Sequence, residues 1–287
     1  MMKIAYSPCP NDTFVFHAWA HGLIPGAPKL DITYADIDIT NGLAASGKGP
    51  DVLKISYAAL PWVLDEYALI PCGGALGRGC GPLVLISGEP ASISAANTAA
   101  HDPAYLSGRT IAVPSERSTA YLLFRLWAAQ AVPGGIGEIV VLPFDQIMPA
   151  VRDGKVDAGL VIHEARFTYP AYGLSLMRDL GSWWEEDTGL PIPLGAIIAR
   201  RSLDLNSIER WTRQSVQYAW AHPDASRQYV MSHAQEMSPE VTDAHINLYV
   251  NQYTENLGED GYAAVTALLG RAADEELVPG IAPGLLR

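Results

Sequence analysis

Two patterns of hydrophobic and polar positions alternate along the first third of the chain. Short alternating or fully apolar runs typical of strands occupy residues 4–7 (IAYS), 30–37 (LDITYADI) and 51–56 (DVLKIS). Runs with helical periodicity or strong helix formers follow each of them, at residues 12–23, 41–49 and 57–67, the last with an internal proline. This order predicts an α/β fold whose sheet is largely parallel and carries helices on both faces.

A second strand–helix series follows. Strand patterns at residues 110–114, 138–143 and 156–163 alternate with helical patterns at 116–130 and 144–155. The strand-like run 193–201 (PLGAIIARR) then returns to the first series, and the rest of the chain reads as helices. We therefore expect lobe I to contain residues 1–87 and 194–287, and lobe II residues 108–193. Residues 88–107, rich in Ala, Ser, Pro and Asn, are expected to form a connecting excursion.

Two crossings of the chain between lobes are typical of a hinged, two-lobed protein that binds its ligand in an interlobe cleft. In such a protein the ligand meets the carboxyl ends of the strands. The chain length of 287 residues is sufficient for two buried cores.

The excess of acidic over basic residues limits the kinds of molecule that the protein can be expected to bind. The formal net charge is −12, from 31 acidic and 19 basic residues. This balance disfavours nucleic acid and anionic membranes as partners, because both are bound through basic patches. No apolar run approaches the length of a membrane span. We expect a small anionic molecule as the substrate, held locally by a few cations, hydroxyls or helix N-termini; the sequence favours no particular oligomeric state.

The cysteines indicate a reducing compartment. Three of them are present, at positions 9, 72 and 80, and they show neither a disulfide framework nor metal-ligand spacing. The first residues already read as a strand rather than as an export signal, so we expect a cytoplasmic protein.

The segment SPCPNDTF, Ser7 to Phe14, joins the first strand to the first helix through two prolines. Asn11 or Asp12 stands where a helix N-cap is expected, and such a turn can present backbone N–H groups to an anion. The alternative is a stiff connection without a ligand. The third strand ends in Lys54-Ile55-Ser56, where Ser56 is expected to cap the next helix, so that its hydroxyl and the following N–H groups can face the cleft; the alternative is a simple N-cap.

A third hydroxyl-bearing turn lies in the predicted lobe II. Ser118, Thr119 and the N–H of Ala120 can form an anion cradle at a helix N-terminus, or simply a capping loop. Three such turns at strand ends favour the binding interpretation more than any one of them does.

His163 is the first polar residue after the buried strand VDAGLVI, at the end of the strand where α/β sites lie. A histidine there can act as a base near neutral pH, and Arg166 can pair with a carboxylate. The alternative is a histidine that only bonds a backbone carbonyl. The glycine-rich run 73–83 lacks the P-loop lysine and the dinucleotide pattern, and the other histidines are scattered over predicted helices. No G-x-S-x-G elbow of a serine hydrolase is present.

Several strings together resemble the 1,4-dihydroxy-6-naphthoate synthase family, which acts in menaquinone biosynthesis by the futalosine route. They span nearly the whole chain in the family's order. The strings SPCPNDTF and HEARFTY are specific to the family rather than generic. One departure from the family's pattern is the stretch 88–107, which is longer than usual. The strings are SPCPNDTF, KISYAAL, GGALGRGCGPL, STAY, GLVIHEARFTYPAYGL, LGSWWEEDTGLPIPLGAI and YVNQYT.

The resemblance implies a type-2 periplasmic-binding-protein fold with C-terminal helices, used as a cytoplasmic lyase. The reaction it implies converts cyclic dehypoxanthinyl futalosine to 1,4-dihydroxy-6-naphthoate and releases dihydroxyacetone, without a metal or organic cofactor. His163 corresponds to the family's proton acceptor, and substrate contacts correspond to Lys54, Ile55, Ser56, Thr119 and Ala120. A binding module for small carboxylates and an enzyme similar to chorismate dehydratase are the competing interpretations, since both share this fold.

Overall fold

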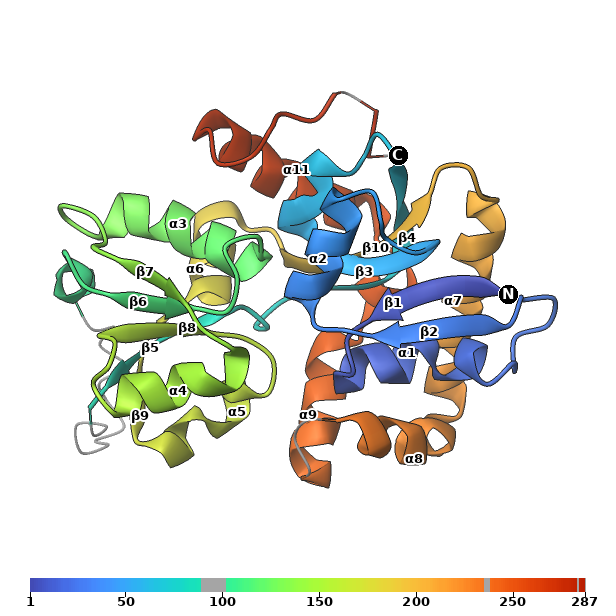
Figure 1. Cartoon of the computed structure of the whole chain (residues 1–287), viewed down its shortest axis with the longest axis horizontal. Coiled ribbons are helices and arrows are strands. Elements are labelled where there is room, and N and C mark those ends of the chain that lie inside the picture. The colour runs from blue at the N-terminus through green and yellow to red at the C-terminus, as the bar shows by residue number, and fades with distance from the viewer. Residues whose placement is uncertain (89–101, 235–237, 283, 287) are drawn as a thin grey trace. The chain divides into compact units, whose positions relative to one another are not determined.

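Residues 1–88, 102–234, 238–282 and 284–286 are described by the computed structural model of the chain. The chain forms two units (Figure 1). Unit 1 contains Met1–Gly77 and Leu190–Arg287, and unit 2 contains Arg78–Gly189. Each unit has a sheet of its own with helices on both faces, as the alternation of strand and helix patterns predicted.

The sheet of unit 1 has five strands within the described residues. In spatial order they are β2 (Leu30–Tyr34), β1 (Met2–Tyr6), β3 (Val52–Ser56), β10 (Ile192–Arg200) and β4 (Tyr67–Gly77). The first three are parallel, and β10 runs antiparallel to both β3 and β4. The strand that returns from unit 2 therefore lies inside this sheet, not at its edge.

Alternate side chains of these strands fill two separate cores. On one face, residues such as Val52 and Ile197 pack against α1 (Pro10–Ala20), α7 (Leu205–Ala221) and α8 (Pro223–His233). On the other, Leu53 and Ile198 pack against residues of α2 (Ile37–Ala45), η1 (Tyr57–Trp62) and α11 (Gly258–Asp274). The period of two along each strand produces this division. Two further helices complete the unit, α9 (Pro239–Tyr249) and α10 (Gln252–Glu255).

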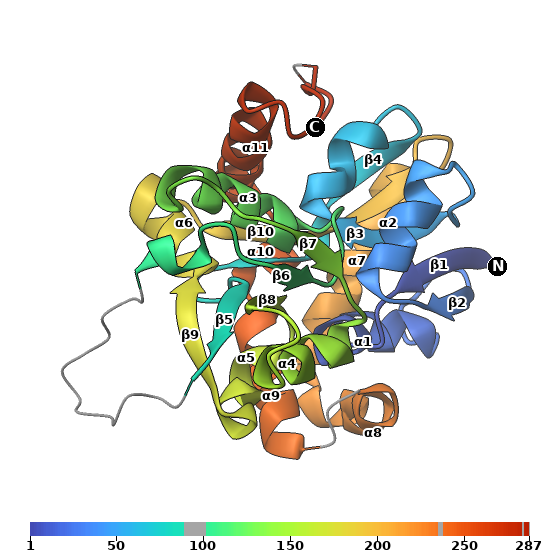
Figure 2. The same cartoon turned by 60° about the vertical axis from the view of Figure 1, so that its left-hand side comes forward.

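The sheet of unit 2 also has five described strands. Their spatial order is β7 (Ile139–Val141), β6 (Ile111–Val113), β8 (Ala158–Val161), β5 (Leu83–Ser87) and β9 (Leu174–Asp179). Figures 1 and 2 show α3 (Thr119–Ala131) and α6 (Leu180–Thr188) over one face, with α4 (Phe144–Arg152) and α5 (Ala165–Thr168) over the other. Short 3-10 helices lie at η2 (Pro103–Leu106) and η3 (Tyr169–Tyr172).

The boundaries of the units differ from the sequence prediction at both crossings. The strand β5 was expected in lobe I but pairs antiparallel with β8 and β9 in unit 2. The chain returns to unit 1 at residue 190 rather than 194. Of the expected connecting excursion 88–107, residues 89–101 lie outside the described residues, and Pro103–Leu106 form η2 of unit 2. A local apolar run cannot specify which of two sheets it joins, so β5 was misassigned.

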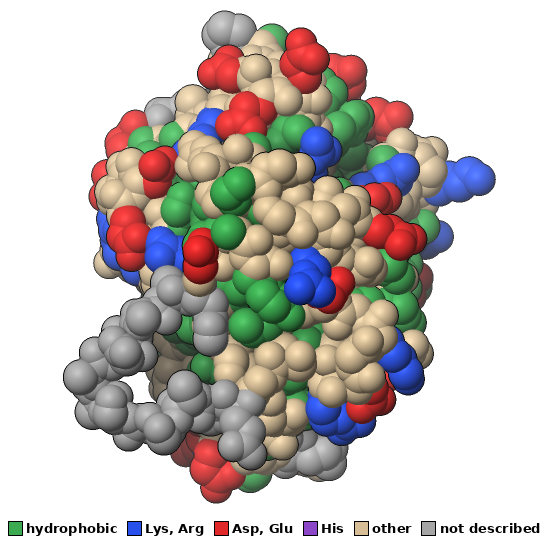
Figure 3. Space-filling model, turned by 90° about the vertical axis from the view of Figure 1, so that its left-hand side faces the viewer, with side chains coloured by type: hydrophobic (Ala, Val, Ile, Leu, Met, Phe, Trp, Pro, Cys, Tyr) green, Lys and Arg blue, Asp and Glu red, His purple; other side chains and the backbone are tan. Residues whose placement is uncertain are grey.

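The segment after β3 is a 3-10 helix rather than the expected α-helix. Pro61 lies inside it, and a proline removes an intrahelical donor and clashes with the preceding turn. The described residues contain no helix that is both long and apolar enough to cross a membrane. On the face shown in Figure 3, acidic and basic side chains are interspersed.

Candidate functional site

The turn after β1 buries its polar residues inside unit 1. Helix α1 begins at Pro10 with Cys9 as its N-cap, so Asn11 and Asp12 lie in the first helical turn and not at the capping position that the sequence predicted. Both side chains are buried, with 9% and 2% of their surface exposed. The Asp12 carboxylate is stabilised there by the positive end of the helix dipole.

Lys54 of β3 pairs with this carboxylate. Its Nζ lies 2.5 Å from Oδ1 of Asp12, and the two side chains are only 4% and 3% exposed. Removing two charges from water costs several kcal/mol per ion before their attraction is counted, so a buried pair is weak evidence of a stabilising role. An ammonium group held at a fixed position is, in contrast, well suited to bind an anionic oxygen.

Gly195 of β10 makes room for the Lys54 side chain. A Cβ atom at position 195 would lie 2.6 Å from Cε of Lys54, far inside van der Waals contact. Gly195 is also the register partner of Ser56. The returning strand thus leaves the space that the lysine occupies.

Asn11 links the ion pair to a histidine that the sequence did not single out. Its Nδ2 donates to Oδ1 of Asp12 over 2.8 Å, and its Oδ1 lies 3.0 Å from Nε2 of His245 on α9. His245 is 1% exposed. Sequence reasoning grouped it with the scattered histidines, because no local signal links residues 234 positions apart.

Ser56 does not cap the helix that follows it, contrary to the sequence prediction. Its side chain makes no capping bond to η1, and its Oγ accepts a 3.0 Å hydrogen bond from Nδ2 of Asn41. Its backbone N–H donates to Oδ1 of the same asparagine over 2.8 Å. Since the Ser56 oxygen is the acceptor, its own O–H proton can be donated to another oxygen.

Ile55 lies between these two residues on β3, with its side chain directed to the opposite core. It is completely buried among residues that pack against α2 and α11. Any contact of Ile55 with a ligand is therefore made by its backbone.

In unit 2, His163 lies two residues past the end of β8, as the sequence predicted. Its φ is +53°, a left-handed conformation that non-glycine residues rarely adopt. Its ring is tilted against Phe144, with the centroids 5.6 Å apart. Backbone strain of this kind is concentrated at functional sites, where the surrounding structure enforces it.

Arg166, in the segment after His163, bonds to residues at the start of two other elements, β5 and α6. Its Nη2 donates to Oδ2 of Asp179 over 2.5 Å, and its Nη1 donates to the carbonyl of Gly81 over 2.8 Å. Oδ1 of Asp179 in turn accepts from the backbone N–H groups of Gly181 and Ser182 at the start of α6. These contacts give Arg166 a structural task beside the substrate contact that the sequence predicted.

The turn before α3 has the geometry of a capping loop, which the sequence offered as the alternative to an anion cradle. Ser118 is the N-cap, and its Oγ accepts from the Tyr121 N–H over 3.1 Å while donating to the carbonyl of Ser115 over 2.9 Å. Thr119 and Ala120 are the first two helical residues, both buried. Their N–H groups belong to the first turn of α3, and backbone donors at a helix N-terminus can bind an anion.

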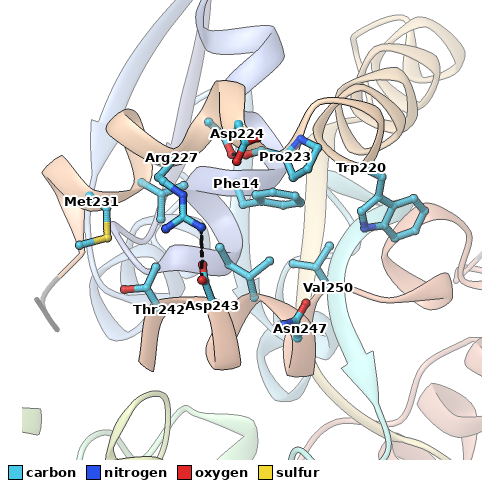
Figure 4. Close-up of a pocket in the computed structure, with 13 residues that line it drawn as sticks. Phe14, Trp220, Pro223, Asp224, Arg227, Met231, Thr242, Asp243, Asn247 and Val250 are labelled. Atoms are coloured by element: carbon cyan, nitrogen blue, oxygen red, sulfur yellow. Dashed lines mark hydrogen bonds and ion pairs between the residues drawn. The ribbon is translucent and has the colours of Figure 1, made fainter. Parts of the chain in front are cut away.

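A separate hollow of about 260 Å³ lies among the helices of unit 1 (Figure 4). Phe14 of α1 and Val250 contribute apolar surface, and an ion pair between Arg227 of α8 and Asp243 of α9 closes part of its wall. Helix α9 therefore lines this hollow and also carries His245.

Comparisons with known proteins identify the family and the fold of the chain. Residues 2–274 match the family described as menaquinone biosynthesis. A 1,4-dihydroxy-6-naphtoate synthase of Streptomyces coelicolor is 66% identical over 288 residues, covering 99% of this chain and 97% of the relative. A synthase of the same name from Thermus thermophilus is 44% identical over 274 residues, covering 94% and 93%.

Two solved structures establish the fold. A protein of Archaeoglobus fulgidus superposes with a TM-score of 0.84 at 35% identity, covering 96% of this chain and 98% of its own. The periplasmic aliphatic sulphonate binding protein of Escherichia coli superposes with a TM-score of 0.66 at 13% identity, covering 97% and 88%. The predicted periplasmic-binding-protein fold is thus confirmed, and the names of the two close relatives favour the enzyme over the binding module. The chain belongs to the menaquinone biosynthesis family.

Proposed function

We propose that the protein is a carbon–carbon lyase that forms 1,4-dihydroxy-6-naphthoate from cyclic dehypoxanthinyl futalosine and releases dihydroxyacetone. The observation that carries this proposal is the near full-length identity of 66% to a relative of that name. We place this reaction in the cytoplasm, a reducing compartment in which the three buried cysteine thiols stay reduced.

His163 acts as the base in this proposal. It removes a proton from the spiro-fused sugar part of the substrate and so starts the carbon–carbon cleavage that ends in an aromatic naphthalenediol. Aromatisation supplies driving force, so the protein contributes chiefly a base, orientation and exclusion of water. The left-handed backbone at His163 supports this role, since backbone strain of this kind is concentrated at functional sites.

The other candidate residues hold the oxygens of the substrate. Lys54 supplies a buried cation, and the hydroxyl of Ser56 has a proton to donate because its oxygen is already an acceptor. In unit 2 the first N–H groups of α3, at Thr119 and Ala120, stabilise negative charge that develops during cleavage. The backbone of Ile55 and the side chains of Asn11, Ser118 and Arg166 complete the proposed contacts.

Product analysis by mass spectrometry tests the proposal. Purified protein is incubated with cyclic dehypoxanthinyl futalosine, alongside His163→Ala and, as a matched control, His222→Ala at an exposed histidine of the same chain. We expect 1,4-dihydroxy-6-naphthoate from the wild type and from His222→Ala, and almost none from His163→Ala. A folded wild-type protein that forms no product would contradict the proposed activity, and full turnover by His163→Ala would remove His163 from it.

A further inference from the structure

A continuous chain of hydrogen bonds runs from α9 to the cation of β3 inside unit 1. It passes from Nε2 of His245 to Asn11 over 3.0 Å, from Asn11 to Asp12 over 2.8 Å, and from Lys54 to Asp12 over 2.5 Å. All four side chains are at least nine-tenths buried, with exposures of 1%, 9%, 2% and 4% along the chain. Bonds of this kind are stronger than in water because the surrounding dielectric is low.

The direction of each bond follows from the carboxylate. The ionised carboxylate of Asp12 only accepts, so the group of Asn11 that faces it must be the NH₂ donor. The amide of Asn11 is thereby turned so that its carbonyl oxygen faces His245. An oxygen acceptor requires a proton on Nε2, so His245 carries its proton on this nitrogen.

Both donors converge on one oxygen. Oδ1 of Asp12 accepts from Asn11 and from Lys54, and this shared atom fixes the direction in which the ammonium group points. A lysine side chain has a flexible four-carbon stem, and the space left by Gly195 further limits its path. Rotation of the Asn11 amide would remove one donor from Asp12 and release the carboxylate to turn.

We propose that His245 is a positioning residue for substrate binding. By holding the amide of Asn11 in one orientation, it keeps Asp12 fixed and so aims the Lys54 ammonium at an anionic oxygen of the substrate. The inference rests on the proposed function only in this last step, because the hydrogen-bond chain exists without the substrate.

Substitutions of different length at one position separate positioning from packing. In His245→Gln the side-chain nitrogen reaches about as far as Nε2 and can still donate to Asn11, whereas in His245→Leu it cannot donate. Asn247→Ala is the control, since Asn247 is exposed on the same helix and lies at the hollow of Figure 4.

We expect His245→Leu to raise KM for cyclic dehypoxanthinyl futalosine by about three- to tenfold, with kcat changed by less than about twofold, because one hydrogen bond is lost equally from ground and transition states. His245→Gln and Asn247→Ala should keep KM near the wild-type value. In an Asn11→Ala background, His245→Leu should have no further effect on KM, because the link is already cut. If His245→Leu fails to fold, His245→Asn, which is one bond too short to reach Asn11, replaces it.

A second readout needs no turnover. Hydrogen exchange of the Asn11 side-chain amide, followed by NMR, should be slow in the wild type and in His245→Gln and faster in His245→Leu. Equal exchange in all three, or a KM that is unchanged in His245→Leu, would overturn the positioning role even if the enzyme makes the expected product. If the wild type makes no product, the proposed function fails, while the exchange measurement still decides whether His245 holds Asn11.

Discussion

A methyl group on Gly195 of β10 would lie 2.6 Å from Cε of Lys54 on the neighbouring strand. Lys54 cannot retreat easily, because it is buried and paired with Asp12. We therefore expect Gly195→Ala to destabilise the fold by about 1–3 kcal/mol, as overpacked core substitutions do. Gly270→Ala is the control, since it adds a methyl group where no atom lies within 4 Å. Urea unfolding measures both; equal midpoints for Gly195→Ala and the wild type would contradict the close packing.

The buried ion pair predicts strong coupling between its two partners. Lys54→Met leaves the Asp12 carboxylate buried without its cation, and a change of this kind costs about 3–5 kcal/mol of unfolding free energy. Asp12→Asn removes the uncompensated charge, so the double variant should be clearly more stable than Lys54→Met alone. A double-mutant cycle in urea checks this, and additive effects would show that the two charges do not interact.

The backbone of His163 predicts an unusual order of stabilities. At a φ of +53°, glycine fits without strain, whereas a residue with a Cβ atom pays about 1–2 kcal/mol for the left-handed conformation. His163→Gly should therefore be more stable than His163→Ala by about 1 kcal/mol, the smaller value reflecting the greater freedom of glycine in the unfolded chain. Chemical denaturation of the two variants gives the difference. Greater stability of His163→Ala would argue against the left-handed backbone.

His17 on α1 predicts a dependence of stability on pH. Burial, with a smaller contribution from the charge of His21, lowers the pKa of His17 below its ordinary value of 6.5. Its Nδ1 has no hydrogen-bond partner among the described residues. The unfolded chain therefore binds a proton at a higher pH than the folded protein does, so stability falls as the pH drops below about 6.5 and levels off below the folded pKa.

Unfolding free energies measured between about pH 5 and about pH 8 check this dependence in the wild type and in His17→Gln. The variant has no titrating group at this position and should show a shallower decline on the acid side. An unchanged slope in His17→Gln would place the titrating group elsewhere.

Two cysteines are expected to be unreactive in the folded protein. Burial raises the pKa of the Cys72 thiol and of the Cys80 thiol to about 12 in each case. At about pH 8 neither is a thiolate, and the thiolate is the form that reacts. Iodoacetamide followed by mass mapping should label both slowly in native protein and rapidly in urea. Rapid native labelling of Cys80 would mean that the loop before β5 opens.

The sequence predicted those parts of the site that depend on local order. His163 follows a run of apolar residues typical of a buried strand, and Ser118 stands directly before a helix, so both positions followed from the pattern. Asp12 was not predicted as the partner of Lys54, nor His245 as the partner of Asn11, because tertiary packing brings together residues that lie far apart in the sequence. The unit to which β5 belongs was missed for the same reason. Its apolar pattern predicts a strand, but which sheet the strand joins depends on its long-range pairing with β8 and β9.

The position of β10 inside the first sheet has a consequence for the order in which the chain acquires structure during synthesis. Unit 2 is one uninterrupted stretch, residues 78–189, and leaves the ribosome with every strand of its sheet present. In unit 1, β4 pairs with β10 alone among the described strands, and β10 begins only at Ile192. Unit 1 begins first and is thus completed last. Until β10 has been synthesised, the apolar eleven-residue strand β4 has no strand to pair with. The early folding of unit 2 shortens the effective distance that β4 and β10 must close to meet.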